Sequence, residues 1–209
     1  MMPRGLYAIT PEELGADALL VRARAALEGG AAALQYRSKS PDAGARRDEA
    51  RALLSMARAK RVPLLVNDDV ELAASIDADG VHLGRDDAGL AAARRRLPGK
   101  LIGASCYASL DLARAAVAAG ADYVAFGSVF ASPTKPGAVR APLGLFREAR
   151  ALGVPLIAIG GITASNAAQL RDAGADGVAV ISDLFDAVDV RGRAAEFARL
   201  FAAVAAHGA

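Results

Sequence analysis

The chain has 209 residues, of which 54% are hydrophobic and 23% are charged, with a net charge of +2. This balance, without a basic run interleaved with aromatic residues, argues against nucleic-acid binding. No apolar stretch reaches the ~20 residues that a membrane span needs, and the first residues lead directly into an apolar run rather than a signal peptide. We therefore expect one cytoplasmic domain over residues 1–209 that does not bind membranes.

Eight short apolar runs follow one another along the chain, and each ends in a polar or glycine-rich segment. They predict strands at residues 6–9, 33–34, 64–66, 80–83, 101–102, 123–126, 156–159 and 178–181. A helix-like stretch follows each polar segment, as at 21–27 and 50–57, where apolar residues recur at helical spacing. Eight strand–helix units predict an α/β fold, a single-domain (β/α)8 (TIM) barrel, with a doubly wound open sheet as the alternative.

Three segments repeat one pattern, at residues 77–84, 120–127 and 174–181. Each combines the end of a helix, a tight turn and a buried strand. Gly120 and Gly174 suit the left-handed position that follows a helix. The strands are almost continuously apolar, which is typical of a parallel sheet covered on both faces.

The active site of such a barrel lies at the carboxyl ends of its strands. After the seventh run, Gly160 and Gly161 precede a helix that we expect to start near Ala164. Glycines there let backbone N–H groups approach a phosphate, and the last two strands of these barrels often build a phosphate site. Ser182 follows the eighth run and completes the predicted site. The alternative is a simple turn.

Acidic residues follow the third and fourth runs, which are neighbours in a barrel. Asp68 and Asp87 are the expected ligands of Mg²⁺, which binds a few carboxylates together with water and phosphate oxygens. Helix capping is the alternative for any aspartate before a helix. We expect Asp69 and Asp86 to be caps or to support the ligands.

Three cations lie in segments that should meet at the same end of the barrel. Arg37 and Lys39 follow the second run, and Lys135 lies in a long segment, 128–138, after the sixth. Together they predict a clamp for pyrophosphate, although each alone would suit a solvated surface. The same long segment offers hydroxyl groups at Ser132 and Thr134, and such loops are often functional.

The remaining reactive side chains carry weaker signals. His82 is expected to be packed or hydrogen-bonded rather than catalytic, and His207 belongs to the tail. Cys106, the single cysteine, cannot form an internal disulfide. It follows the end of a predicted strand and could border the site, but a packing role is expected because no histidine lies near it in the sequence. The arginine clusters 46–47 and 94–96 are expected on solvated helix faces.

These segments, taken together, resemble the thiamine-phosphate synthase family. The resemblance is carried by residues 35–39 (Gln-Tyr-Arg-Ser-Lys), 66–68 (Val-Asn-Asp), 79–87, 103–105 (Gly-Ala-Ser), 127–135 and 159–162. It covers nearly the whole chain, and the motifs are specific as a set. It implies a Mg²⁺-dependent transferase that joins an aminopyrimidine diphosphate to a thiazole phosphate, or to its carboxylate, giving thiamine phosphate and pyrophosphate by a dissociative substitution.

The resemblance also implies roles for individual residues. Ser105 and Lys135 would be catalytic, with Ser105 beside the reacting centre. Gln35 would contact the pyrimidine, and the diphosphate would be held by Arg37, Lys39, Asn67 and Lys135. The thiazole side would contact Ser132 and Thr134, and its phosphate would lie at Gly160, Gly161, Ile181 and Ser182. Ser132 stands where the family often has threonine, which preserves the hydroxyl group.

Two other functions remain as alternatives. A thiazole tautomerase shares the barrel but has no diphosphate chemistry, and the paired aspartates with the Thr134-Lys135 segment argue against it. A non-catalytic phosphate-binding barrel is the other, because a fold alone does not determine a function. In either case we expect small-molecule partners, and a homo-oligomer is compatible with the pattern.

Overall fold

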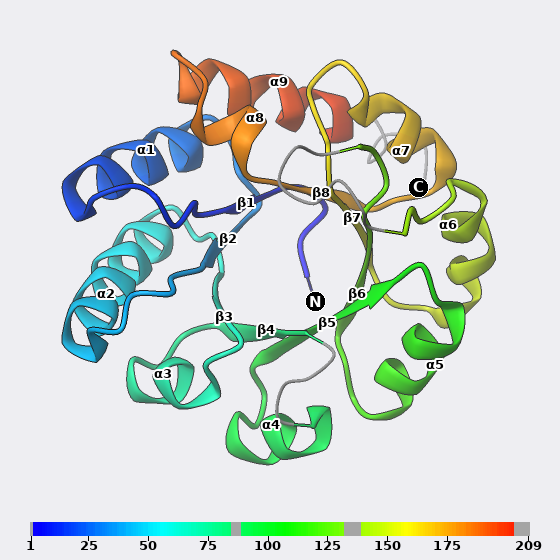
Figure 1. Cartoon of the computed structure of the whole chain (residues 1–209), viewed down its shortest axis with the longest axis horizontal. Coiled ribbons are helices and arrows are strands. Elements are labelled where there is room, and N and C mark those ends of the chain that lie inside the picture. The colour runs from blue at the N-terminus through cyan, green and yellow to red at the C-terminus, as the bar shows by residue number, and fades with distance from the viewer. Residues whose placement is uncertain (1, 85–88, 132–138, 203–209) are drawn as a thin grey trace.

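Eight parallel strands form a closed barrel whose order around the ring follows the sequence (Figure 1). The computed structural model describes residues 2–84, 89–131 and 139–202. The strands are β1 (Gly5–Ile9), β2 (Ala33–Tyr36), β3 (Leu64–Asn67), β4 (Gly80–Leu83), β5 (Leu101–Tyr107), β6 (Tyr123–Phe126), β7 (Leu156–Ile159) and β8 (Gly177–Val180). The predicted barrel is confirmed, and the open sheet is excluded because β1 also pairs with β8.

Helices form a ring around the barrel (Figure 1). They are α1 (Ala16–Glu28), α2 (Ala43–Ala59), α3 (Val70–Ser75), α4 (Leu90–Arg96), α5 (Leu110–Ala118), α6 (Gly144–Ala149), the 3₁₀ helix η1 (Arg150–Leu152), α7 (Ala167–Ala173), α8 (Ser182–Phe185) and α9 (Val190–Ala202). Side chains cap several of them, as where Asp42 accepts from the backbone of Gly44. In the part of the chain that the structure describes, no helix has the length and apolar character to cross a membrane.

Three strands extend further than the apolar runs predict. β2 continues through Gln35 and Tyr36, and β3 includes Asn67. β5 continues past Ser105 to Tyr107. Polar side chains do not interrupt a strand whose backbone pairing continues, and Gln35 pairs with Leu65 while Ser105 pairs with Ala125. These polar residues therefore lie on rigid strands.

The core has two parts, one between barrel and helices and one inside the barrel. The inner part contains large side chains such as Tyr7, Leu65, Tyr123 and Ile157, all almost fully buried. Met2 packs with them, and Figure 1 shows the segment before β1 running inside the ring of strands. Because β1 begins at Gly5, this segment fills the amino end of the barrel. The opposite end is the one expected to hold the site.

The repeated sequence pattern builds a recurring contact at the amino ends of the strands. Asp77, Gly120 and Gly174 all have left-handed backbone φ angles, of 58°, 96° and 106°. Two residues later, an aspartate carboxylate accepts a hydrogen bond from a backbone N–H at the start of the preceding strand. The pairs are Asp79 with Leu64 at 2.9 Å, Asp122 with Ile102 at 2.7 Å and Asp176 with Leu156 at 2.9 Å.

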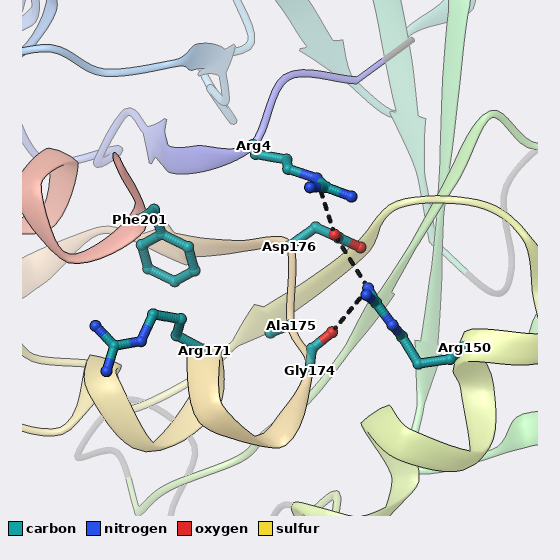
Figure 2. A pocket seen from close by; sticks show the side chains of 7 residues that line it. All are labelled: Arg4, Arg150, Arg171, Gly174, Ala175, Asp176 and Phe201. Atoms are coloured by element: carbon teal, nitrogen blue, oxygen red, sulfur yellow. Dashed lines mark hydrogen bonds and ion pairs between the residues drawn. The ribbon is translucent and has the colours of Figure 1, made fainter. Parts of the chain in front are cut away.

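An arginine accompanies each of these carboxylates. Arg58 and Arg94 come from α2 and α4, and Arg150 comes from η1. Figure 2 shows the third case, in which Arg4 and Arg150 both reach Asp176, at 3.1 and 3.2 Å, beside a pocket of about 50 Å³. We call the three aspartates the amino-end clamps. They explain the repeat as a stabilising feature, as expected for this end of the barrel.

Arg94 corrects one expectation. It is not simply solvated, because its guanidinium donates to the carbonyl oxygens of Lys100 and Gly120 and to Asp122. By contrast, Arg96 is exposed and pairs with Glu71 on the neighbouring helix α3. Neighbouring arginines on this short helix thus have different roles, because only one face of the helix turns toward the barrel. Arg94 pairs with an amino-end clamp, whereas Arg96 lies at the surface.

Candidate active site

Most of the predicted site residues lie at the carboxyl ends of the strands. Within the described part of the chain these are Gln35, Arg37, Lys39, Asn67, Asp68, Ser105, Gly160, Gly161, Ile181 and Ser182. Asp86, Asp87, Ser132, Thr134 and Lys135 lie outside the described residues, so their predicted roles stay predictions. The pocket in Figure 2 lies at the other end of the barrel and belongs to the amino-end clamps.

Arg37 and Lys39 are brought together at the end of β2 by an acidic residue. The Glu12 carboxylate lies 2.9 Å from the guanidinium of Arg37 and 3.6 Å from the ammonium of Lys39. Nearby, the fully buried Thr10 hydroxyl accepts from the Arg37 backbone N–H at 2.8 Å. The two predicted cations therefore share one location. No sequence pattern points to Glu12, which lies in a short polar connection like many surface residues.

The ends of β3 and β4 meet at Asp68. Its backbone is left-handed, with φ of 61°, and its carboxylate accepts from the Asn67 side-chain amide at 2.6 Å and from the Gly84 backbone N–H at 3.3 Å. The side chain remains exposed at the end of the barrel. Asp69, in contrast, caps α3 by accepting from Leu72, which confirms its predicted capping role.

A chain of hydrogen bonds crosses the barrel interior beneath these ends. The Gln35 amide donates to the Tyr7 hydroxyl at 2.7 Å, and the Tyr7 and Tyr123 hydroxyls lie 3.0 Å apart. His82 Nδ1 lies 2.9 Å from the Tyr123 hydroxyl, and His82 Nε2 lies 2.9 Å from the Ser105 hydroxyl. We call these five residues the interior chain. It confirms the expectation that His82 is hydrogen-bonded.

Close approach inside the barrel makes this chain possible. Gly103 is the register neighbour of both His82 and Tyr123. A Cβ atom at Gly103 would overlap the Tyr123 ring, so only glycine leaves the phenol room to lie against β5 and reach the imidazole. Burial raises the pKa of Tyr7 and of Tyr123 far above their ordinary value. Both phenols therefore keep their protons.

The two glycines after β7 have backbone angles that favour glycine, with φ of 100° at Gly160 and 65° at Gly161. They are also sites of close packing. A Cβ atom at Gly160 would come 2.8 Å from Ser128 Cα, and one at Gly161 would come 2.8 Å from the Phe130 carbonyl carbon. The glycines thus have a packing reason of their own, besides any approach to a phosphate.

The segment after these glycines is already partly hydrogen-bonded. Asn166 accepts from the Thr163 N–H at 2.9 Å, which delays the start of α7 to Ala167 rather than Ala164. Asp183 accepts from the Ala164 N–H at 3.1 Å and pairs with Arg193 at 2.7 Å. Asp183 therefore ties the ends of β7 and β8 together, directly after Ser182.

Cys106 does not border the site. It lies within β5, is almost fully buried in the outer core, and burial raises its pKa to about 12. The predicted packing role is confirmed. The next residue, Tyr107, is half exposed with a φ of 51° at an irregularity in the pairing of β5 with β6.

The described groups suit a ligand that carries phosphate. Two cations, a carboxylate beside an amide, and a serine hydroxyl open on the same end of one rigid barrel. Among the described residues, no three His, Cys, Asp or Glu side chains cluster as a metal site. A magnesium ion can be held by one or two carboxylates with water and phosphate oxygens, so Asp68 fits that donor chemistry.

Comparisons of the sequence with known proteins point to one family. A family profile described as thiamine monophosphate synthase matches residues 6–184. The chain is 59% identical over 203 residues to a thiamine-phosphate synthase from Thiobacillus denitrificans, with 96% of each chain covered. It is 55% identical over 199 residues to one from Methylobacillus flagellatus, covering 95% of each. A solved thiamine phosphate pyrophosphorylase from Pyrococcus furiosus matches with a TM-score of 0.85 at 35% identity over 96% of both chains.

Proposed function

We infer the chemistry of this site from one premise: the chain belongs to the thiamine monophosphate synthase family. Its function is that of a transferase of thiamine biosynthesis. It joins 4-amino-2-methyl-5-hydroxymethylpyrimidine diphosphate to 4-methyl-5-(2-phosphoethyl)thiazole or its carboxylate, and it releases pyrophosphate. The carbon–oxygen bond to the diphosphate breaks first with its electron pair on oxygen, and the thiazole nitrogen then forms the new bond to carbon.

We propose that Arg37 and Lys39 bind the diphosphate together with Asn67. The observation that carries this proposal is their shared position, since both cations lie within 3.6 Å of Glu12 at the same barrel end as Asp68. The Arg37–Glu12 contact is an ion pair without an aligned hydrogen bond at Glu12 Oε1. The guanidinium can therefore direct N–H groups to phosphate oxygens while Glu12 fixes its position.

Asp68 is the proposed ligand of Mg²⁺, with Asp87 as the second carboxylate. Support comes from an exposed carboxylate at the end of β3, held by Asn67 and Gly84, and from the preference of Mg²⁺ for oxygen. A bound Mg²⁺ would supply positive charge that stabilises the leaving diphosphate. The residues of this chain hold that diphosphate in one orientation, which lowers the cost of reaching the transition state.

The second anion site is proposed at the ends of β7 and β8, where Gly160, Gly161, Ile181 and Ser182 would hold the thiazole phosphate. Among the described residues, no group accepts from the N–H of Gly161 or Ile162, whereas those of Thr163 and Ala164 are paired. Two adjacent N–H groups in a left-handed turn form a concave anion site. Asp183 does not oppose this, because Arg193 neutralises it.

Gln35 and Ser105 are proposed to face the pyrimidine, with Ser105 beside the reacting carbon and Lys135 on the leaving group. Ser132 and Thr134 would contact the thiazole. Support for the first pair comes from their positions on β2 and β5, joined through the buried interior chain. Buried side chains fill the barrel interior beneath these groups, so water does not reach the site from that side, which would help to protect a carbocation from hydrolysis. A cytoplasmic location and a homo-oligomer stay predictions from the sequence.

A coupled assay tests the proposal. The protein is supplied with both substrates and Mg²⁺, and pyrophosphate and thiamine phosphate are measured together, with each component omitted in turn. We expect equal amounts of the two products, and none when a substrate or the ion is left out. Product formation that ignores chelation of Mg²⁺ would contradict the metal proposal, and absence of product under all conditions would contradict the function.

A further inference from the structure

The direction of the interior chain can be worked out by counting protons. The Gln35 amide nitrogen donates to Tyr7, so the Tyr7 oxygen accepts there. Tyr7 keeps its proton, and within the described residues the only acceptor for that proton is the Tyr123 oxygen. Tyr123 must then donate to His82 Nδ1, which leaves the imidazole proton on Nε2, facing Ser105.

The opposite direction leaves a buried proton without a partner. If Ser105 donated to Nε2, Nδ1 would carry the proton and donate to Tyr123, which would donate to Tyr7. Tyr7 would then accept from both sides while its own proton met no acceptor among the described residues. Tyr7 is 1% exposed, so water could not replace that acceptor. A doubly protonated imidazole would create the same defect.

We propose that the interior chain is polarised from Gln35 to Ser105, and that His82, in its Nε2–H form, is a positioning residue that turns the Ser105 hydroxyl proton toward the bound diphosphate substrate. The substrate part rests on the proposed function. Ser105 accepts from His82 and has no other partner among the described residues, so its proton points to whatever occupies the barrel end. The serine therefore acts as a donor there, not an acceptor.

Two features of the fold support a fixed direction. Gly103 lets the Tyr123 ring lie against β5, which places the phenol oxygen within hydrogen-bond distance of His82 Nδ1. All five residues of the interior chain belong to strands, namely β1, β2, β4, β5 and β6. A site built on strands holds its geometry better than one built on loops. The polarity is thus a property of the barrel and does not depend on the ligand.

Nitrogen-15 NMR of the imidazole rings tests the polarity in the ligand-free protein. The chain has two histidines, so the spectrum of His207→Ala assigns His82 without ambiguity. At neutral pH we expect the proton on Nε2 and a bare Nδ1 that accepts a hydrogen bond. A proton on Nδ1, or on both nitrogens, would overturn the proposal. This measurement needs no substrate and no activity.

A reversal experiment tests the coupling along the chain. In Gln35→Glu, an ionised carboxylate can only accept a hydrogen bond. The donor and acceptor roles of Tyr7, Tyr123 and His82 should therefore all reverse, and the imidazole proton should move to Nδ1. Carbon-13 labelling of the new carboxyl group verifies its ionisation. Adding Tyr7→Phe interrupts the chain and should return the proton to Nε2, since Tyr123 then has only His82 as acceptor. An ionised carboxylate with His82 unchanged would overturn the coupling.

Kinetics test the effect on Ser105. Tyr123→Phe removes the group that holds Nδ1, and we expect turnover to fall about fivefold, the size of one neutral hydrogen bond. In a Ser105→Ala background, Tyr123→Phe should have no effect on turnover, because Tyr123 acts only through its effect on Ser105. Tyr7→Phe is the matched control, since it removes the other phenol oxygen but leaves Tyr123 to donate to His82, and its loss should be smaller.

The outcomes separate this inference from the proposed function. Equal losses from Tyr123→Phe with and without Ser105 would reduce His82 and Tyr123 to packing residues, although the enzyme still made thiamine phosphate. If the wild-type protein made no product, the proposed function would fail while the nitrogen-15 result still decided the polarity of the chain.

Discussion

Asp176 is expected to contribute more to stability than the other two amino-end clamps. Its side chain is only 8% exposed, and it accepts from the buried N–H of Leu156. Asp176→Ala leaves that N–H without a partner, which costs about 1–3 kcal/mol. The ion pairs with Arg4 and Arg150 add at most about 1 kcal/mol, because those arginines are 60% and 55% exposed. We therefore expect the free energy of unfolding to fall by about 1–4 kcal/mol.

Urea denaturation, monitored by circular dichroism, measures this difference if the slope of each transition is unchanged. Asp79→Ala and Asp122→Ala should cost less, about 1–2 kcal/mol, because their side chains are 30% and 37% exposed and water can replace part of the lost bond. Asp48→Ala, an exposed residue of α2, is the control and should change stability by under about 0.5 kcal/mol. If Asp176→Ala resembled this control, the clamps would not be stabilising features.

Further predictions concern the site and the core. Lys135→Ala should lower turnover by about two orders of magnitude or more, because the charge of Lys135 acts on the leaving group, and Lys135→Arg should recover part of the loss. Steady-state kinetics that show only a raised Michaelis constant would contradict this. Ser182→Ala should raise the Michaelis constant for the thiazole phosphate about tenfold, since one charge-assisted hydrogen bond is lost. The Michaelis constant for the pyrimidine diphosphate should stay within about twofold of its wild-type value. Equal effects on both Michaelis constants would argue against two anion sites. Cys106 should not react with a thiol reagent at mildly alkaline pH until urea unfolds the protein, because its raised pKa keeps the thiol protonated. Fast reaction of the folded protein would contradict the burial of Cys106.

The barrel could be predicted from sequence because its strands are uninterrupted apolar runs. Every predicted run coincides with an observed strand, and the errors lie at the ends, as at Gln35 and Ser105. These polar residues face the barrel interior while their backbones stay paired. A hydropathy pattern reads such residues as the end of a strand, although the backbone ladder continues.

The interior chain could not be predicted in the same way. Tyr7 and Tyr123 look like ordinary core aromatics, and His82 lies among apolar residues. Their contacts depend on strand register around the closed barrel and on the missing side chain at Gly103. Glu12 and Asp183 were also missed, because a single acidic residue in a connection has no periodicity to reveal a partner far along the chain.

The most direct test of the account is the turnover of Asp68→Asn over a series of Mg²⁺ concentrations, followed by pyrophosphate release. The substitution keeps the size of the side chain and removes the proposed ligand charge. We expect turnover to fall by about two orders of magnitude, partial recovery at high Mg²⁺, and a urea transition like that of the wild-type protein. Wild-type turnover at limiting Mg²⁺ would contradict the account, because Asp68 would then not hold the metal at the carboxyl end of the barrel.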